Sequence, residues 1–295
     1  MSEVNAPFGH VLTAMVTPFD AAGALDLDAA ARLATYLVDE QGNDGLIISG
    51  TGGESPTTTD AEKSELLAAV VAAVGDRAHI LAGVGTFDTA HTVHLAQQAA
   101  KAGAHGLLVV TPYYSRPPQA GVLQHFRTVA DATDLPILMY DIPHRSGIPI
   151  ETDTLLRLAE HERIVGVKDA KGDVVASGRV IAESGLVFYS GDDALTLPLL
   201  SVGGVGVVGT STHFCGRQAG ELIAAFLRGD VAGALRLHRQ LYPIFTGIFR
   251  TQGTILVKAG LRLRGFDAGA VRSPLVDATA EQVEQLRADL TAAGV

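Results

Sequence analysis

Eight short runs of small and β-branched apolar residues recur along the first two thirds of this 295-residue chain. Each run is closed by a turn-forming residue and followed by a stretch with helical periodicity. Strands that alternate with helices predict a parallel sheet with right-handed crossovers, and eight such units favour a closed (β/α)₈ TIM barrel over an open doubly wound sheet. The runs cover residues 11–16, 45–49, 80–84, 106–110, 136–140, 164–168, 186–190 and 206–208.

The strand signal stops after Thr212, and the rest of the chain has the pattern of helices. Glycine or proline marks the breaks between these helices, and no low-complexity linker precedes them. The predicted helices cover residues 218–227, 231–249, 254–263 and 281–293. The sequence therefore predicts a catalytic barrel over residues 1–212 and a C-terminal helical region, residues 213–295, packed on it.

Charge and composition exclude several classes of protein. A net charge of -10 argues against a nucleic-acid partner, which would require a clustered positive field. The single cysteine, Cys215, excludes an intrachain disulfide framework and fits a reducing compartment. Residues 1–7 lack the order of a signal peptide, and no apolar run reaches the ~18 residues of a membrane helix. We expect a cytoplasmic protein that does not bind membranes.

Lys168 ends the sixth apolar run. A buried strand of a parallel barrel delivers its last side chain to the end of the barrel where active sites lie. Partial burial lowers the pKa of an ammonium group, and the neutral amine attacks carbonyl carbons to form a Schiff base. Taken alone, a lysine here is more simply a surface residue, because lysine side chains are usually exposed.

Three other strand ends carry residues that suit the same chemistry. Residues 49–56 form a glycine-rich turn whose backbone N–H groups can bind an anion. The fourth run ends near Tyr113 and Tyr114, and the fifth ends at Tyr140, with Arg145 close behind. A tyrosine hydroxyl near an ammonium is expected to have a lowered pKa and to move protons, and arginine offers a rigid fork for a carboxylate. Together with Lys168, these positions predict one active site.

The most specific motifs are residues 50–54, 111–114, 140–147, 167–170 and 190–193. Through them, and over nearly its whole length, the sequence resembles the pyruvate-dependent class I aldolases typified by dihydrodipicolinate synthase. The resemblance implies a lyase of lysine and diaminopimelate biosynthesis that needs no metal and no cofactor. It also implies a homotetramer built from tight dimers.

The resemblance assigns a role to each catalytic candidate. Lys168 would form a Schiff base with pyruvate, and the enamine would attack L-aspartate 4-semialdehyde. Tyr140 would donate and accept protons. Thr51 would link Tyr140 to Tyr114, which in this family crosses a dimer interface into the neighbouring site, so a monomer would have an incomplete site.

Four binding contacts follow from the same resemblance. Arg145 would bind the carboxylate of the semialdehyde, as in the synthase branch rather than the sialic-acid lyase branch. The backbone N–H groups of Thr51 and Gly52 would bind the carboxylate of pyruvate, and the main-chain carbonyl of Val208 would line the pocket. Glu54 is interpreted as a carboxylate that shapes the glycine-rich turn, in preference to a general base.

The sequence departs from the family pattern at several positions. Gly52 stands where the family usually has threonine, which predicts weaker pyruvate binding or an altered choice of keto acid. Residues 209–211 stand where the synthases commonly carry a Ser-Val pair, so the sequence does not determine which residues form the floor of the pocket. The positions that bind L-lysine as a feedback inhibitor in many bacterial synthases are occupied by Asp60, Lys63, Phe87 and His91. Because Phe87 and His91 do not preserve the expected amide and carboxylate, and Lys63 repels a cation, we predict weak or absent inhibition by lysine.

Two other functions remain open at this point. One keeps the Schiff base and changes the acceptor, giving a sugar-acid aldolase or dehydratase of the same superfamily. The other is a non-catalytic barrel that binds a keto acid, although such a binder would not need an amine beside a proton relay.

Overall fold

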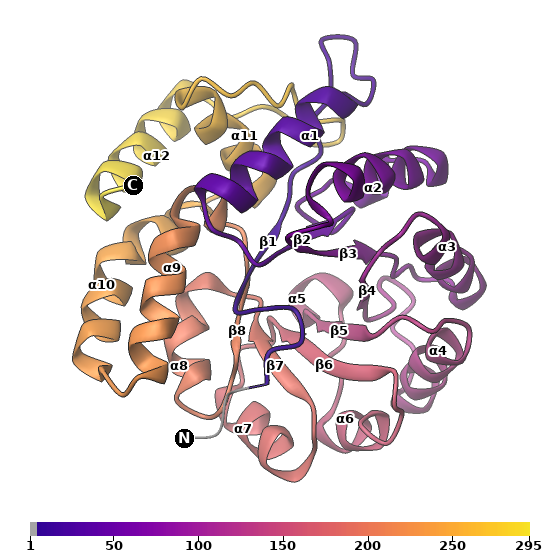
Figure 1. Cartoon of the computed structure of the whole chain (residues 1–295). Helices are drawn as coiled ribbons and strands as arrows, with labels where there is room; N and C mark the ends of the chain where they lie inside the picture. The colour runs from indigo at the N-terminus through magenta and orange to yellow at the C-terminus, as the bar shows by residue number, and fades with distance from the viewer. Residues whose placement is uncertain (1–4) are drawn as a thin grey trace.

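The computed structural model describes residues 5–295, and it contains a closed barrel of eight parallel strands surrounded by helices (Figure 1). The strands follow one another around the barrel in chain order, and pairing between β1 and β8 closes it. The TIM barrel is thereby confirmed and the open sheet excluded. Residues 1–4, which belong to the predicted barrel domain and to the segment without a signal-peptide pattern, lie outside the described residues. The strands are β1 (Val11–Ala14), β2 (Gly45–Ile48), β3 (His79–Gly83), β4 (Gly106–Val110), β5 (Ile137–Asp141), β6 (Ile164–Asp169), β7 (Val187–Ser190) and β8 (Gly206–Gly209).

Helices connect the strands and continue beyond the last one. Side chains cap several of them; Thr59 and Glu62, for example, form a reciprocal capping box at the start of α2. No helix within residues 5–295 has the length and apolar character needed to cross a bilayer. The helices are α1 (Leu27–Thr35), η1 (Tyr36–Glu40), η2 (Ser55–Thr57), α2 (Asp60–Val74), α3 (Thr89–Lys101), α4 (Gln119–Asp131), α5 (Pro143–Ser146), α6 (Thr152–Leu158), α7 (Val174–Glu183), η3 (Asp193–Leu195), α8 (Thr196–Leu200), α9 (Thr212–Leu227), α10 (Val231–Gly247), α11 (Gly253–Leu263) and α12 (Ala280–Ala293).

The strand register decides which side chains enter the barrel. Successive residues of a strand point to opposite faces, so Tyr140 packs inside the barrel while Met139 packs outward against the helices. Lys168 pairs with Tyr140 on one side and with Tyr189 on the other. Neighbouring residues of parallel strands point to the same side, and the register therefore directs Lys168 into the barrel mouth between two tyrosines.

The first helix after β8 begins earlier than predicted, whereas α10 begins at Val231 as predicted. α9 starts at Thr212, six residues before the predicted start, and is kinked at Cys215, where φ is -131°. It packs against β1 and against α10, and so occupies the position of the eighth helix of the barrel (Figure 1). α10, α11 and α12 form a further group of packed helices beside it. The predicted boundary at residue 212 places α9 with the C-terminal helices, and it stays a prediction.

Candidate functional site

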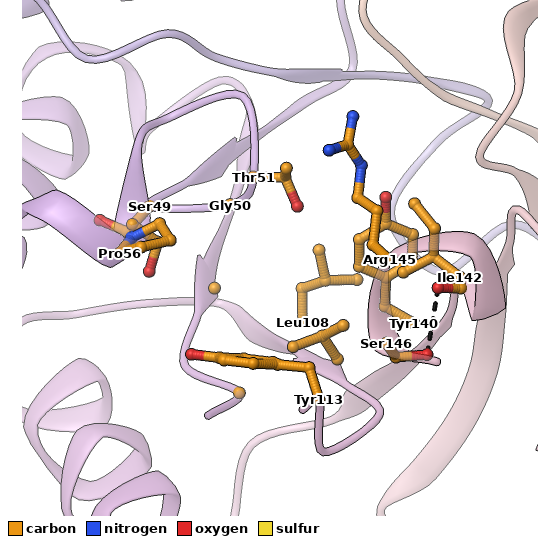
Figure 2. A pocket seen from close by; sticks show the side chains of 14 residues that line it. Ser49, Gly50, Thr51, Pro56, Leu108, Tyr113, Tyr140, Ile142, Arg145 and Ser146 are labelled. Atoms are coloured by element: carbon orange, nitrogen blue, oxygen red, sulfur yellow. Dashed lines mark hydrogen bonds between the residues drawn. The ribbon is translucent and has the colours of Figure 1, made fainter. Parts of the chain in front are cut away.

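Two adjoining cavities lie at the carboxyl ends of the strands. The larger, of about 650 Å³, contains Lys168 and is called the lysine cavity here. The smaller, of about 240 Å³, is lined by Tyr113 and is called the tyrosine cavity (Figure 2). Both are lined by Thr51, Tyr140, Ile142 and Arg145. Three of the predicted site residues thus form the boundary between the cavities, and Lys168 lines the larger one.

Lys168 is a buried amine to which residues 5–295 offer no carboxylate partner. Its side chain is 5% exposed, and Nζ lies 4.2 Å from the centroid of the Tyr140 ring. Among residues 5–295, no carboxylate lies within ion-pair distance of Nζ. Burial lowers the pKa of Lys168 from 10.5 to about 8; the charge of Asp193 opposes this change and that of Arg145 adds to it. At pH 7 about one tenth of the amine is then neutral, far more than for a lysine with the ordinary pKa of 10.5.

The pKa of Tyr140 corrects one prediction. We expected the nearby ammonium to lower it, but burial raises it to about 12. The neighbouring Arg145 and Thr51 oppose that effect without overcoming it. The physical reason is that the loss of hydration on burial outweighs the nearby groups that favour the charged phenolate, Arg145 and Thr51. Tyr140 is therefore a protonated hydroxyl at neutral pH, suited to donate a proton first.

The glycine-rich turn after β2 places Thr51 and Gly52 at the cavity wall. It closes on itself through the Gly53 N–H, which donates to the Gly50 carbonyl at 3.0 Å. Its packing leaves little room, because a Cβ at Gly52 would lie 2.9 Å from the Ala14 carbonyl oxygen. A threonine at this position would thus require the backbone to move.

Arg145 reaches both cavities from α5, the short helix that follows β5. The side chain of Ser146 holds this helix in place by donating to the carbonyl oxygens of Ile142, at 3.1 Å, and Ile148, at 2.8 Å (Figure 2). Figure 2 shows the guanidinium of Arg145 on the same side of the cavity as Tyr140, with Thr51 opposite. A carboxylate in this space would have a cation, a phenol and a hydroxyl around it.

Two predicted residues lie elsewhere. Tyr114 is 92% exposed and adopts a left-handed backbone conformation, with φ at 69°. The tyrosine that lines the cavity is Tyr113, whose ring packs edge-on against Phe87. Val208 lines neither cavity; its side chain is buried in the barrel interior, and the wall beyond β8 is formed by Thr210, two residues later. Burial of the side chain leaves the position of the main-chain carbonyl toward a ligand untested, so the role of Val208 stays a prediction.

Sequence reasoning assigned no role to two groups of residues at the site, although Asp193 lies in one of the motifs it named. Asp193 is buried near Lys168 and accepts hydrogen bonds from the backbone N–H groups of Thr210, at 3.2 Å, and Ser211, at 3.0 Å. One wall of the lysine cavity comes from the C-terminal helices, and includes Thr246, Phe249, Gln252 and Thr254. Within residues 5–295, no cluster of three or more His, Cys, Asp or Glu side chains is placed to hold a metal ion.

A buried, unpaired amine at the carboxyl end of a closed (β/α)₈ barrel, in a cavity shared with a tyrosine and an arginine, places the protein among the barrel enzymes. Comparison with known proteins defines the group more closely. The model of the dihydrodipicolinate synthetase family matches residues 7–293. The chain belongs to this family, and it is a lyase.

Individual relatives match over almost their full length. The 4-hydroxy-tetrahydrodipicolinate synthase of Acidothermus cellulolyticus is 71% identical over 98% of this chain and 94% of its own. A second, from Streptomyces coelicolor, is 58% identical over 100% of this chain and 98% of its own. Among solved structures, dihydrodipicolinate synthase from Cyanidioschyzon merolae with lysine bound aligns with a TM-score of 0.95 and 41% identity, covering 97% of this chain and 98% of that one.

Proposed function

We propose that this protein condenses pyruvate with L-aspartate 4-semialdehyde to give 4-hydroxy-tetrahydrodipicolinate, through a Schiff base on Lys168. The observation that carries the proposal is the unpaired amine of Lys168, with its pKa lowered to about 8, in a cavity that also presents Arg145. Relatives at 71% and 58% identity carry the name of this activity. The reaction belongs to lysine and diaminopimelate biosynthesis, and we place it in the cytoplasm.

The chemistry begins with the neutral amine of Lys168, which attacks the keto carbon of pyruvate; loss of water gives an iminium ion. Removal of a methyl proton then gives an enamine. Its carbon attacks the aldehyde, and the new alkoxide takes a proton. The amino group of the semialdehyde finally displaces Lys168 and closes the ring. Tyr140 moves the protons in these steps, since its hydroxyl is protonated at neutral pH and borders both cavities.

Both substrates carry a carboxylate, and we assign each carboxylate to the donors in the site that suit a negative charge. The backbone N–H groups of Thr51 and Gly52 hold the carboxylate of pyruvate, because the glycine-rich turn lines the cavity that contains Lys168. Arg145 holds the carboxylate of the semialdehyde by a charge-assisted contact. An Arg145→Ala variant should therefore raise KM for the semialdehyde more than KM for pyruvate.

A second acceptor class has one observation in its favour. The lysine cavity, at about 650 Å³, is lined on its outer wall by the polar side chains of Thr246, Thr251 and Gln252, which suit the hydroxyl groups of a sugar acid. The test is a steady-state assay with pyruvate and either the semialdehyde or a panel of aldehydes derived from sugar acids. Faster turnover with the semialdehyde supports the proposal, and faster turnover with a sugar-derived aldehyde would replace it.

We further propose that the active form is a homotetramer built from tight dimers, in which Tyr114 of one subunit enters the site of another. The exposure of Tyr114 and its left-handed backbone favour a role outside its own chain. Sedimentation analysis together with the activity of Tyr114→Phe tests this. A fully active monomer would contradict it.

Weak or absent inhibition by L-lysine remains our proposal. The Asp60 carboxylate already makes a 2.9 Å hydrogen bond with His91, and Lys63, which donates to the Thr58 carbonyl at 2.5 Å, is a cation that repels a cationic ligand. Strong inhibition by millimolar lysine in the steady-state assay would overturn this proposal.

A further inference from the structure

The backbone of the glycine-rich turn is held from outside the barrel. The carbonyl oxygen of Gly52 accepts a hydrogen bond at 2.9 Å from the hydroxyl of Thr254, which lies 202 residues away on α11. The next carbonyl, of Gly53, accepts one at 2.6 Å from the hydroxyl of Thr17. Gly52 has no side chain to restrict its dihedral angles, so these hydrogen bonds fix the two peptide planes that follow Gly52 and Gly53. Those planes adjoin the ones that carry the N–H groups of Thr51 and Gly52, and they limit how far these groups can turn.

An ion pair fixes the end of the same turn. Glu54 has a left-handed backbone, with φ at 55°, and a side chain that is almost wholly buried. Its carboxylate lies 2.8 Å from Nζ of Lys258 and accepts the backbone N–H of Arg272 at 2.7 Å. The amine of Lys258 also donates to the Ala270 carbonyl at 2.9 Å. Glu54 does shape the turn, as the sequence predicted, and its partners come from the C-terminal helical region.

Thr254 and Lys258 are four residues apart on α11 and therefore share one face of that helix. Thr254 also lines the lysine cavity. The helix that forms one wall of this cavity thus contacts the turn at two points, at the carbonyl of Gly52 and at the carboxylate of Glu54.

We propose that Thr254 and the Lys258–Glu54 ion pair are positioning residues that hold the N–H groups of Thr51 and Gly52 in place to bind the carboxylate of a 2-keto acid. The inference rests on the proposed function, which makes these groups the pyruvate site. It gives the C-terminal helices a role in substrate affinity in addition to their packing.

The test compares Thr254→Val, which removes the hydroxyl at nearly constant volume, with Thr254→Ser, which keeps it. The readout is the pyruvate concentration that gives half-maximal trapping on Lys168 by cyanoborohydride, together with KM and kcat in the steady-state assay. We expect Thr254→Val to raise the half-saturating pyruvate concentration and KM about tenfold, the effect of one lost hydrogen bond, with kcat changed less than about threefold. Thr254→Ser should match the wild type.

Ser184→Ala is the matched control. The Ser184 hydroxyl donates to the Val180 carbonyl at 2.7 Å, just before β7 and so at the opposite end of the barrel. If a loss of stability were the cause, the half-saturating pyruvate concentration would rise in both Thr254→Val and Ser184→Ala. If Thr254 positions the turn, it rises only in Thr254→Val. The inference is overturned if Thr254→Val leaves the half-saturating pyruvate concentration and KM unchanged, or if Ser184→Ala raises them equally. A wild-type protein that traps no pyruvate on Lys168 overturns the proposed function, and this inference falls with it.

Discussion

Two lysines, Lys168 and Lys258, are buried in this molecule, and their surroundings differ in one decisive respect. Lys258, at 1% exposed, has a dedicated carboxylate from Glu54 and a carbonyl acceptor from Ala270. Lys168, at 5% exposed, lies over the ring of Tyr140 and has no ion-pair partner among residues 5–295. Burial lowers the pKa of both amines, but only at Lys258 does a bonded carboxylate favour the charged form. A buried amine that is paired with a carboxylate, as Lys258 is, holds the structure together. A buried amine with no such partner, as Lys168 is, is available as a nucleophile.

Replacing Lys168 should cause the largest loss of activity of all the variants and should not lower the stability of the fold. We expect Lys168→Met to lower kcat by at least about 10⁴-fold, because Lys168 is the one lysine among residues 5–295 that lines the lysine cavity. The shift of the Lys168 pKa from 10.5 to about 8 corresponds to about 3 kcal/mol of destabilisation at pH 7. Urea unfolding at pH 7 should therefore show a variant at least as stable as the wild type. A marked loss of stability would make Lys168 a structural residue like Lys258.

Replacing Lys258 should produce the reverse pattern. Lys258→Met leaves the Glu54 carboxylate buried without its cation, which should lower the free energy of unfolding by about 3 to 5 kcal/mol. The double variant Glu54→Gln with Lys258→Met should recover part of that loss, since no charge remains buried. Urea unfolding of the two variants measures the difference. Equal stability of Lys258→Met and the wild type would contradict the structural role of the pair.

The pH dependence separates the two amines without mutation. Because the folded-state pKa of Lys168 is depressed, its neutral fraction rises with pH through about 8, well before an ordinary lysine titrates. By linkage, its destabilising effect grows as pH falls from 10.5 toward 8 and is complete below that range. We expect the initial rate of pyruvate trapping to rise between pH 6 and 9 with a midpoint near 8. A midpoint near 10 would show an amine in an ordinary environment.

The variant with the smallest expected effect, Gly191→Ala, tests how tightly the side chain of Lys168 is packed. A Cβ at Gly191 would lie 3.0 Å from Cγ of Lys168, so Gly191→Ala should push the lysine stem off its preferred rotamer. We expect about a fivefold rise in KM for pyruvate in the steady-state assay. Gly185→Ala, where a Cβ meets nothing within 4 Å, is the control and should change nothing. A larger effect in the control than in Gly191→Ala would contradict this placement.

The barrel and the main members of the site could be predicted because they depend on local patterns. Eight alternating units determine the closed sheet, and a parallel barrel brings the ends of its strands together, which places Thr51, Tyr140, Arg145 and Lys168 at one mouth. The direction of the Tyr140 pKa shift could not be predicted, because it depends on how completely the hydroxyl is removed from water, which only the packed structure gives.

The contribution of α11 was missed for a different reason. A lysine in a helix normally lies at the solvent-exposed face, and Lys258 gains its partner only through contacts across some 200 residues of sequence. One signal was present: Lys258 lies within residues 255–261, where every other residue is apolar or glycine. A charge inside such a run is a candidate for a buried pair. The sequence alone does not identify Glu54 as its partner.

The most direct test of the account is to map the pyruvate adduct to a residue. The protein is incubated with pyruvate and cyanoborohydride at pH 7 to 8, digested, and analysed by mass spectrometry of its peptides. We predict one adduct per chain, on Lys168 and not on Lys258, and none in Lys168→Met. An adduct on another lysine, or no adduct on the folded protein, would contradict the claim that the unpaired buried amine is the nucleophile.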